Sequence, residues 1–153
     1  MTMDITPDDL TADDTLALIA AHLTGMRAQS PEESVHALDV DALRSPDITF
    51  YAARLDGGLA GIGALKLLGD GDGEIKSMRV DDRLLGRGVG RAILRHLVAE
   101  AESRGIRRLW LETGSSDDFV AARTLYASEG FEECGPFADY RLDPNSTFMT
   151  RAL

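Results

Sequence analysis

Apolar residues between positions 74 and 105 follow first an extended and then a helical pattern, with a glycine-rich turn between them. The run Glu74 to Val80 (EIKSMRV) reads as a strand, and Asp81-Asp82 ends it. After the turn, apolar residues recur at the spacing of one helix face, and Gly105 lies where a helix commonly stops. This segment therefore predicts a strand, a turn and a long amphipathic helix. The apolar face of that helix would comprise Val89, Ile93, Leu94, Leu97, Val98 and Ala101.

The remaining hydrophobic pattern predicts strands and helices on both sides of this segment. Strands are expected at residues 1–5, 48–55, 59–68, 108–113, 131–133 and 146–151, with a hairpin turn at residues 56–58. Helices are expected at residues 10–26, 30–43 and 117–128, the second of them opening with a capping box at Ser30 and Glu33. In chain order this predicts a mixed α/β fold in a single domain covering residues 1–153.

Composition and charge narrow the classes of partner. The chain has 153 residues, 44% hydrophobic and 27% charged, as in a globular protein. Its formal net charge of −10 argues against nucleic acid, whose binding needs clustered cations, and no apolar run is long enough to span a membrane. A single cysteine, Cys134, suits a reducing cytoplasm, and the three histidines lack partners at metal-ligand spacing. We therefore expect a cytoplasmic protein with no metal, no nucleic-acid partner and no membrane partner.

Three glycines at alternate positions, Gly86, Gly88 and Gly90, open the central helix. Missing side chains let backbone N–H groups approach a ligand, and the positive end of the helix dipole lies at the same place. Arg87 and Arg91 add full positive charges, whose position at the helix start is unfavourable unless an anion binds there. The turn therefore predicts a ligand that carries phosphate.

The spacing of the turn distinguishes between known phosphate-binding loops. It lacks the pattern G-x-x-x-x-G-K-[ST], and Arg91 stands where the dinucleotide fingerprint G-x-G-x-x-G needs its third glycine. Residues 85–90 (LGRGVG) are instead similar to [Q/R]-x-x-G-x-[G/A], the acyl-CoA signature of the GNAT N-acetyltransferase superfamily. The one departure is Leu85, which occupies the Gln/Arg position.

A second segment, residues 120–131 (VAARTLYASEGF), resembles the family's fourth helix. In that helix an alanine and a tyrosine precede a Gly-Phe pair, and here these residues are Ala122, Tyr126, Gly130 and Phe131. Family members usually carry asparagine where this chain has Phe119. Many also place a strand glutamate at the position of Glu74. Across nearly its full length the chain resembles the YsnE-like group of bacterial GNAT acetyltransferases, through the segments HALD, EIKSMRV, LWLETGS and CGPFADYRLDPNSTFM.

The resemblance implies the GNAT fold, a twisted and mostly antiparallel sheet of six or seven strands with a splay in its middle and about four flanking helices. The strand ending at Val80 and the strand from Arg108 would separate. Backbone groups freed there would pair with the amide-bearing arm of acetyl-CoA (coenzyme A) as co-substrate. The residues implied to bind this co-substrate are Met78, Arg79, Val80, Leu85, Gly86, Arg87, Gly88, Val89, Gly90, Arg91 and Phe119.

The implied reaction moves an acetyl group from acetyl-CoA to a primary amine by direct attack in a ternary complex. Tyr126 would protonate the departing thiolate, and Glu74 would accept the proton of the amine, directly or through water. The alternative interpretations are a core aromatic for Tyr126 and a solvated strand-edge carboxylate for Glu74. The acceptor pocket would take side chains from both ends of the chain, namely His36, Asp39, Phe137 and Tyr140.

A small-molecule amine is the expected acceptor, because nothing in the sequence marks a peptide groove. Acetylation of a peptide or protein amine is an alternative within the same class of enzyme. From another class, the chain could be a non-catalytic acyl-CoA sensor, an alternative supported by the departures at Leu85 and Phe119. A homodimer is also left open.

Overall fold

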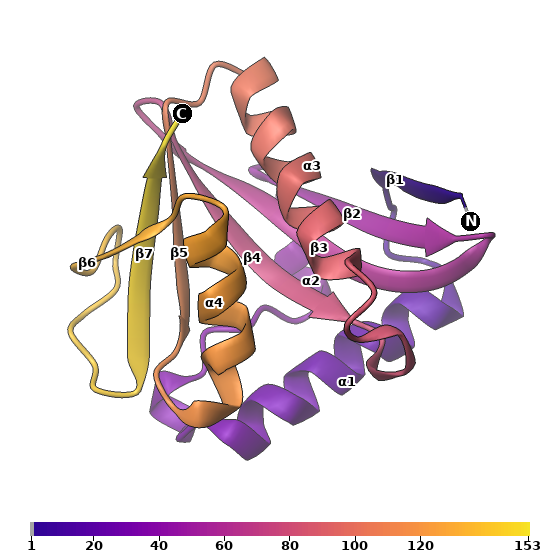
Figure 1. Cartoon of the computed structure of the whole chain (residues 1–153), viewed down its shortest axis with the longest axis horizontal. Coiled ribbons are helices and arrows are strands. Elements are labelled where there is room, and N and C mark those ends of the chain that lie inside the picture. Colours follow the sequence, from indigo (N-terminus) through magenta and orange to yellow (C-terminus); the bar gives the residue numbers. More distant parts are fainter. Residues whose placement is uncertain (1) are drawn as a thin grey trace.

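The computed structural model describes residues 2–153, whose seven strands form one sheet in the order β1-β2-β3-β4-β5-β7-β6 (Figure 1). Neighbouring strands are antiparallel except for the pair β4 and β5, which is parallel. The strands are β1 (Met3–Pro7), β2 (Ile48–Leu55), β3 (Gly58–Gly69), β4 (Asp72–Val80), β5 (Arg108–Gly114), β6 (Glu132–Cys134) and β7 (Ser146–Ala152). The helices are α1 (Asp13–Gln29), α2 (Val40–Leu43), α3 (Val89–Ser103) and α4 (Val120–Ser128), with 3-10 turns at Glu32–Ser34, Asp82–Leu84 and Asp117–Phe119. This mixed α/β architecture confirms the predicted fold class.

The helices build two apolar cores, one on each face of the sheet. Leu94 of α3 packs in the larger core, and Ile19 of α1 and Leu43 of α2 pack in the smaller one. Because successive residues of a strand point to opposite faces, Ala64 of β3 belongs to the smaller core and Leu65 to the larger. The face that carries Ala64 is therefore the face of α1 and α2.

The central segment has the predicted structure. β4 ends at Val80, α3 begins at Val89, and all six residues of the predicted apolar face are buried. Gly105 follows the end of α3 with a φ of +77°, a conformation that glycine adopts without strain. Periodicity and the glycine stop therefore sufficed to define this helix.

β4 and β5 are neighbours only at their beginnings. The ladder between them pairs Asp72 with Arg108 and ends where Glu74 meets Trp110. Beyond this point the two strands separate, as their divergence in Figure 1 shows. Ser77 adds an irregularity, since its φ of +56° coincides with a register shift between β3 and β4. The sheet therefore has the mid-sheet splay that the resemblance implied, and one edge of β4 lacks a strand partner along it.

The prediction of a helix over residues 30–43 is wrong. Only Glu32–Ser34 and Val40–Leu43 are helical, and no side-chain cap is formed at the first turn. The Ser34 hydroxyl instead donates a hydrogen bond of 2.6 Å to Asp143, which lies 109 residues away. Asp39 caps α2 by accepting a hydrogen bond from the Ala42 amide. A contact between distant parts of the chain thus replaces the local capping box.

The other helices begin within a few residues of their predicted starts. α1 starts at Asp13 rather than residue 10 and runs on to Gln29.

Residues 2–153 contain neither a cluster of metal ligands nor a membrane-spanning helix. No three side chains of His, Cys, Asp or Glu in this range gather as metal ligands would. The helices of that range are all too short or too polar to cross a bilayer.

Candidate functional site

The glycine turn leaves the start of α3 open. Gly86 and Gly88 have φ values of +77° and +82°, and a Cβ atom at either position would meet nothing within 4 Å. Gly88 caps α3 without a side chain, and the first turn of α3 contains no acidic residue. The first N–H groups of this helix therefore lack a capping side chain and present a positive end to an incoming anion.

The two arginines of the turn differ in their surroundings. Arg91 is half-exposed and donates a hydrogen bond of 3.0 Å to Ser128, and its guanidinium lies 3.4 Å from the Glu129 carboxylate. Arg87 is exposed at the tip of the turn. Leu85, at the signature position of Gln or Arg, is 63% exposed and projects no charge toward the turn. The positive character of the turn thus comes mainly from Arg87 and the helix itself, because the charge of Arg91 is balanced by Glu129.

The β4 residues predicted to hold the co-substrate lie along the splay. The Arg79 guanidinium packs over Gly25 of α1 and lies 3.6 Å from the Asp82 carboxylate. Val80 lies against Gly90 at the start of α3, and the Met78 sulfur lies beside Gly63. These three residues therefore connect the open edge of β4 with the glycine turn and with α1.

Phe119, at the position of the family's asparagine, is buried at the other side of the splay. Its ring occupies the space beside Gly114, where a Cβ atom would lie only 2.1 Å from the ring. Phe119 therefore supports the end of β5 by packing, and it contributes no amide side chain to a ligand.

Tyr126 lies on α4 and is buried, with its ring packed edge-on against Phe131. Burial, assisted by the negative charge of Glu112, raises the pKa of the Tyr126 phenol to about 12. The phenol is therefore protonated at neutral pH and can donate a proton.

Glu74 is buried where the ladder between β4 and β5 ends, and it is not a solvated edge residue. Its Oε2 accepts a hydrogen bond of 2.6 Å from the Tyr140 hydroxyl and one of 3.1 Å from Lys76 Nζ. Lys76 also donates a hydrogen bond of 2.8 Å to the Tyr140 hydroxyl oxygen, which closes a triangle of three groups. Burial and the Glu74 charge raise the pKa of Tyr140, so its hydroxyl keeps its proton. This triangle ties the segment between β6 and β7 to the sheet.

Glu112 of β5 is a second carboxyl group near the splay, half-buried, that no sequence pattern indicated. Burial raises the pKa of Glu112 to about 7, although the nearby Ser146 hydroxyl and Lys76 ammonium act in the opposite direction. Its charge also affects the pKa of Tyr126 and that of Tyr140. Glu112 therefore lies close enough to the phenol of α4 and to the triangle around Glu74 to influence the ionisation of both tyrosines. Its strand alternation resembles that of any half-exposed residue, so only its packing identifies it.

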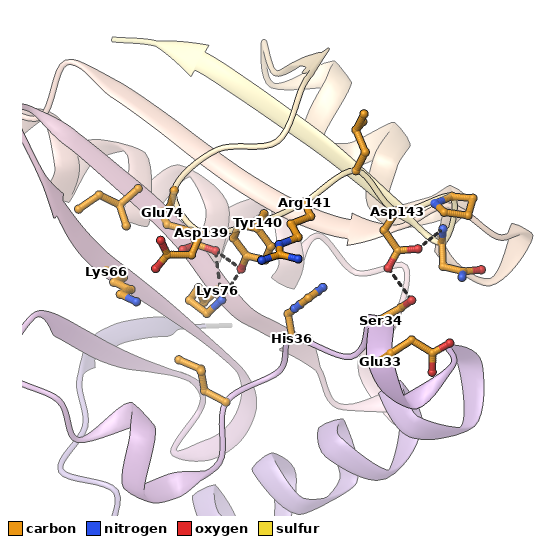
Figure 2. A pocket seen from close by; sticks show the side chains of 16 residues that line it. Glu33, Ser34, His36, Lys66, Glu74, Lys76, Asp139, Tyr140, Arg141 and Asp143 are labelled. Atoms are coloured by element: carbon orange, nitrogen blue, oxygen red, sulfur yellow. Dashed lines mark hydrogen bonds and ion pairs between the residues drawn. The ribbon is translucent and has the colours of Figure 1, made fainter.

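A cavity of about 660 Å³ opens beside this triangle, on the face of the sheet that carries Ala64. Its walls come from residues 33–38, from β3 and β4, and from residues 138–145. Figure 2 shows His36 reaching in from one wall and Tyr140 from the other, and their rings meet edge-on at 4.9 Å. Burial and the charge of Lys76 lower the pKa of His36 from 6.5, which keeps the imidazole neutral at pH 7.

Of the four residues predicted for the acceptor pocket, His36 and Tyr140 line this cavity. Asp39 is exposed, and its side chain is occupied as the cap of α2. Phe137 is buried behind the wall, where its ring stacks on Trp110 at 5.4 Å. The structure therefore brings two of the four together and gives the other two structural positions.

Comparison with known proteins agrees with this geometry. The model of the acetyltransferase (GNAT) family matches residues 15–131. The chain belongs to the GNAT family. It is 52% identical to the uncharacterized N-acetyltransferase YedL of Escherichia coli, over 97% of this chain and 94% of that protein. It is equally similar, at 52%, to the uncharacterized N-acetyltransferase YsnE of Bacillus subtilis, over 99% of this chain and 100% of that protein.

Solved structures show the same GNAT fold. A Klebsiella pneumoniae protein assigned as an acyl-CoA N-acyltransferase superposes with a TM-score of 0.81 at 31% identity, covering 99% of this chain and 98% of that one. The PaiA N-acetyltransferase of Thermoplasma acidophilum, solved with coenzyme A, superposes with a TM-score of 0.76 at 18% identity over the whole of both chains. The second likeness concerns the fold alone.

Proposed function

We propose that this protein is an acetyl-CoA-dependent N-acetyltransferase that acts on the primary amine of a small molecule. The observation that carries the proposal is the splay between β4 and β5, which has the open glycine turn at one end and the cavity beside its apex. One ligand can therefore reach the splay from the turn while another reaches it from the cavity. Membership of the GNAT family supports this arrangement.

The residues around the splay fit coenzyme A. Its diphosphate would rest on the N–H groups of residues 87–91, where the helix end and Arg87 supply positive character. The open edge of β4 near Met78–Val80 would accept its amide-bearing arm as an added strand. The coenzyme A bound to the Thermoplasma acidophilum PaiA protein of the same fold gives further support. Phe119 would contribute apolar contact in place of an amide.

Two groups would handle the protons of the transfer. The protonated Tyr126 phenol would donate to the departing sulfur, because a buried phenol with a pKa of about 12 is fully protonated. A carboxylate would take the proton that the attacking amine loses. Glu74 stays a prediction for this role, but its Oε2 already accepts two hydrogen bonds.

Glu112 suits the role of base better than Glu74. A general base works best when its pKa lies near the working pH, and the pKa of Glu112 is raised to about 7. Its electrostatic influence on both Tyr126, the proposed acid, and Tyr140, which lines the cavity, supports this role. We therefore propose Glu112 as the base and Glu74 as the residue that positions Lys76 and Tyr140.

Thiol release from acetyl-CoA, measured across a panel of small amines, tests this function. An acetyltransferase releases coenzyme A in an amine-dependent manner, and mass spectrometry finds the amine heavier by one acetyl group. A sensor would bind coenzyme A in calorimetry without turnover on any amine. Release that requires a peptide substrate would instead favour the protein-acetylating alternative.

A further inference from the structure

The two lysines of the chain lie in one place. Of the 16 basic residues, 14 are arginine, and the only lysines are Lys66 and Lys76. Both line the cavity described above, one from β3 and the other from β4. Lysine is a compact point charge on a flexible stem, whereas arginine is a broad planar fork, so the two are not interchangeable at a binding site. A function of the two lysines is therefore to be expected in the cavity that both of them line.

The two lysines have different surroundings. The Lys76 side chain is only 9% exposed, and its charge is balanced by the Glu74 carboxylate at 3.1 Å. Ion pairs and hydrogen bonds within residues 2–153 involve Lys76 but neither Lys66 nor Arg141, the third cation of the cavity wall. Figure 2 shows Lys66 on the β3 side of the cavity and Arg141 on the side of the segment between β6 and β7. Two uncompensated cations thus share one cavity in a protein of net charge −10.

The strand register relates these cations to the proposed base. Lys66 is the direct partner of Glu74, and Glu74 is the direct partner of Trp110. Glu112 lies two residues beyond Trp110 on the same face of β5. Lys66 and Glu112 are therefore two strands apart, roughly 10 Å across the sheet, and are offset by two residues, roughly 7 Å, along it. The lysine stem and a small acceptor can bridge that gap together.

The charges of the cavity are mixed. Exposed carboxylates of Glu33 and Asp139 line it together with Lys66 and Arg141, and the buried Glu74 carboxylate lies at its floor. An acceptor with only an amine would meet two uncompensated cations, and an acceptor with only a carboxylate would meet the acidic floor. A molecule that carries both an amine and a carboxylate can pair with the carboxylates and with the cations of the cavity.

We propose that the acceptor is an amino acid, whose amine enters toward Glu112 and whose carboxylate is bound by Lys66 with help from Arg141. This inference rests on the proposed acetyltransferase function and specifies its substrate class. No covalent step is added, because the carboxylate binds only by charge and hydrogen bonds. Lys66 is in this view a specificity residue at a distance from the reacting atoms.

Matched acceptors test the proposal. The standard amino acids, β-alanine and 4-aminobutyrate are each compared with the carboxamide that replaces the carboxylate and keeps the length. The wild-type protein should acetylate at least one acid with a KM at least tenfold below that of its amide. Lys66→Met should raise the KM for that acid at least tenfold, leave the KM for the amide within twofold, and leave the affinity for coenzyme A unchanged. Lys66→Arg should recover part of the loss.

Arg27→Met supplies the control for a lost positive charge, because Arg27 is exposed on α1 and lies outside the cavity lining. It should leave both KM values unchanged. Equal use of acids and amides, or equal loss of both in Lys66→Met, would overturn the carboxylate assignment while the acetyltransferase function stands. If the wild-type protein binds coenzyme A but acetylates no amine of any kind, the proposed function fails and this inference fails with it.

Discussion

Tyr126 and Glu112 are two titratable groups near the splay whose pKa values are raised by the same cause, burial. The pKa of Tyr126 rises to about 12, so the phenol keeps its proton through the physiological range. The pKa of Glu112 rises to about 7, so this carboxyl exchanges its proton within that range. One environment thus yields a group that can give a proton and a group that can take one up.

Replacing Tyr126 by phenylalanine should remove the proton donor without opening a cavity. We expect kcat to fall about a hundredfold, the usual size of a general-acid contribution, while affinity for coenzyme A changes by less than twofold. Steady-state kinetics and calorimetry provide the two readouts. Tyr51→Phe is the matched control, because it removes another buried tyrosine hydroxyl, one that contacts Glu100 and Arg104 away from the splay. An affinity loss without a fall in kcat would show that Tyr126 only packs against the ligand.

The raised pKa of Glu112 predicts a specific pH profile for the reaction. The base acts when deprotonated, so kcat/KM should rise with pH through an apparent pKa of about 7 and level off about one unit above that pKa. Glu112→Gln should lower the plateau and remove this limb. Glu74→Gln should lower activity through the loss of its contacts with Lys76 and Tyr140 but keep the limb. The assignment of the two roles is reversed if the limb disappears only in Glu74→Gln.

The raised pKa of Glu112 also predicts how the unfolding free energy depends on pH. A carboxyl group whose pKa is higher in the folded than in the unfolded state contributes stability below its unfolded pKa, and that stability is lost as pH rises. The unfolding free energy of the wild-type protein should therefore fall between pH 4.5 and pH 7 relative to that of Glu112→Gln, and the difference should stay constant above pH 7. Urea titrations at half-unit steps of pH measure it. Parallel curves for the two proteins would mean that Glu112 is ionised in the folded state as it is in water.

At the scale of elements, sequence patterns predicted correctly those helices and strands that interactions between near neighbours in the chain determine. The helix after the glycine turn followed from apolar spacing and a glycine stop, both of which act within a few residues. The predicted helix from Ser30 failed because the Ser34 hydroxyl bonds to Asp143 across 109 residues, a contact that no local pattern contains. Glu112 was missed for the same reason, since its alternation in β5 does not reveal the surroundings that raise its pKa.

The start of α3 offers a test in which folding and binding separate. Gly88 has a φ of +82° and open space at its Cβ position, so alanine there should cost about 1 kcal/mol of stability through backbone strain alone. The new methyl group would also enter the proposed diphosphate site, so affinity for coenzyme A should fall at least tenfold. Gly105→Ala is a matched control, because Gly105 has a φ of +77° and equal space at the other end of the helix. It should show the same loss in thermal unfolding and no loss of affinity.

A result in which Gly88→Ala and Gly105→Ala bind coenzyme A equally well would place the diphosphate elsewhere. An equal fall in affinity for both would instead point to a general effect of helix stability. Only a fall confined to Gly88→Ala supports the assignment of the turn.

At the scale of the whole molecule, the sheet consists of two parts joined by a short ladder. β1 to β4 form one antiparallel part and β5, β7 and β6 the other, and the parallel pairing between them covers only three residues on each strand. The sequence could predict the strands but not that Lys66 lines a cavity. The proposed role of Lys66 depends on this cavity, which the separated parts of the sheet and residues 138–145 form together. The candidate acid and base belong to the β5 side of this junction and the glycine turn to the β4 side, so their relative geometry is a property of the assembled sheet.

The junction makes a prediction about dynamics. A ligand that pairs with the open edge of β4 and touches α4 binds both parts of the sheet, and a ligand present at 100 times its Kd stabilises the fold by about 2.7 kcal/mol. Hydrogen exchange read by mass spectrometry should therefore slow on addition of coenzyme A in residues 75–80 and 85–91. Exchange in β1, on the far edge of the sheet, should slow only through global unfolding. Dephospho-coenzyme A, which keeps the diphosphate and the amide-bearing arm, should give the same pattern. Protection that appears in β1 and β2 but not along β4 would mean that the splay is not where the ligand binds, and the function proposed for it would fall.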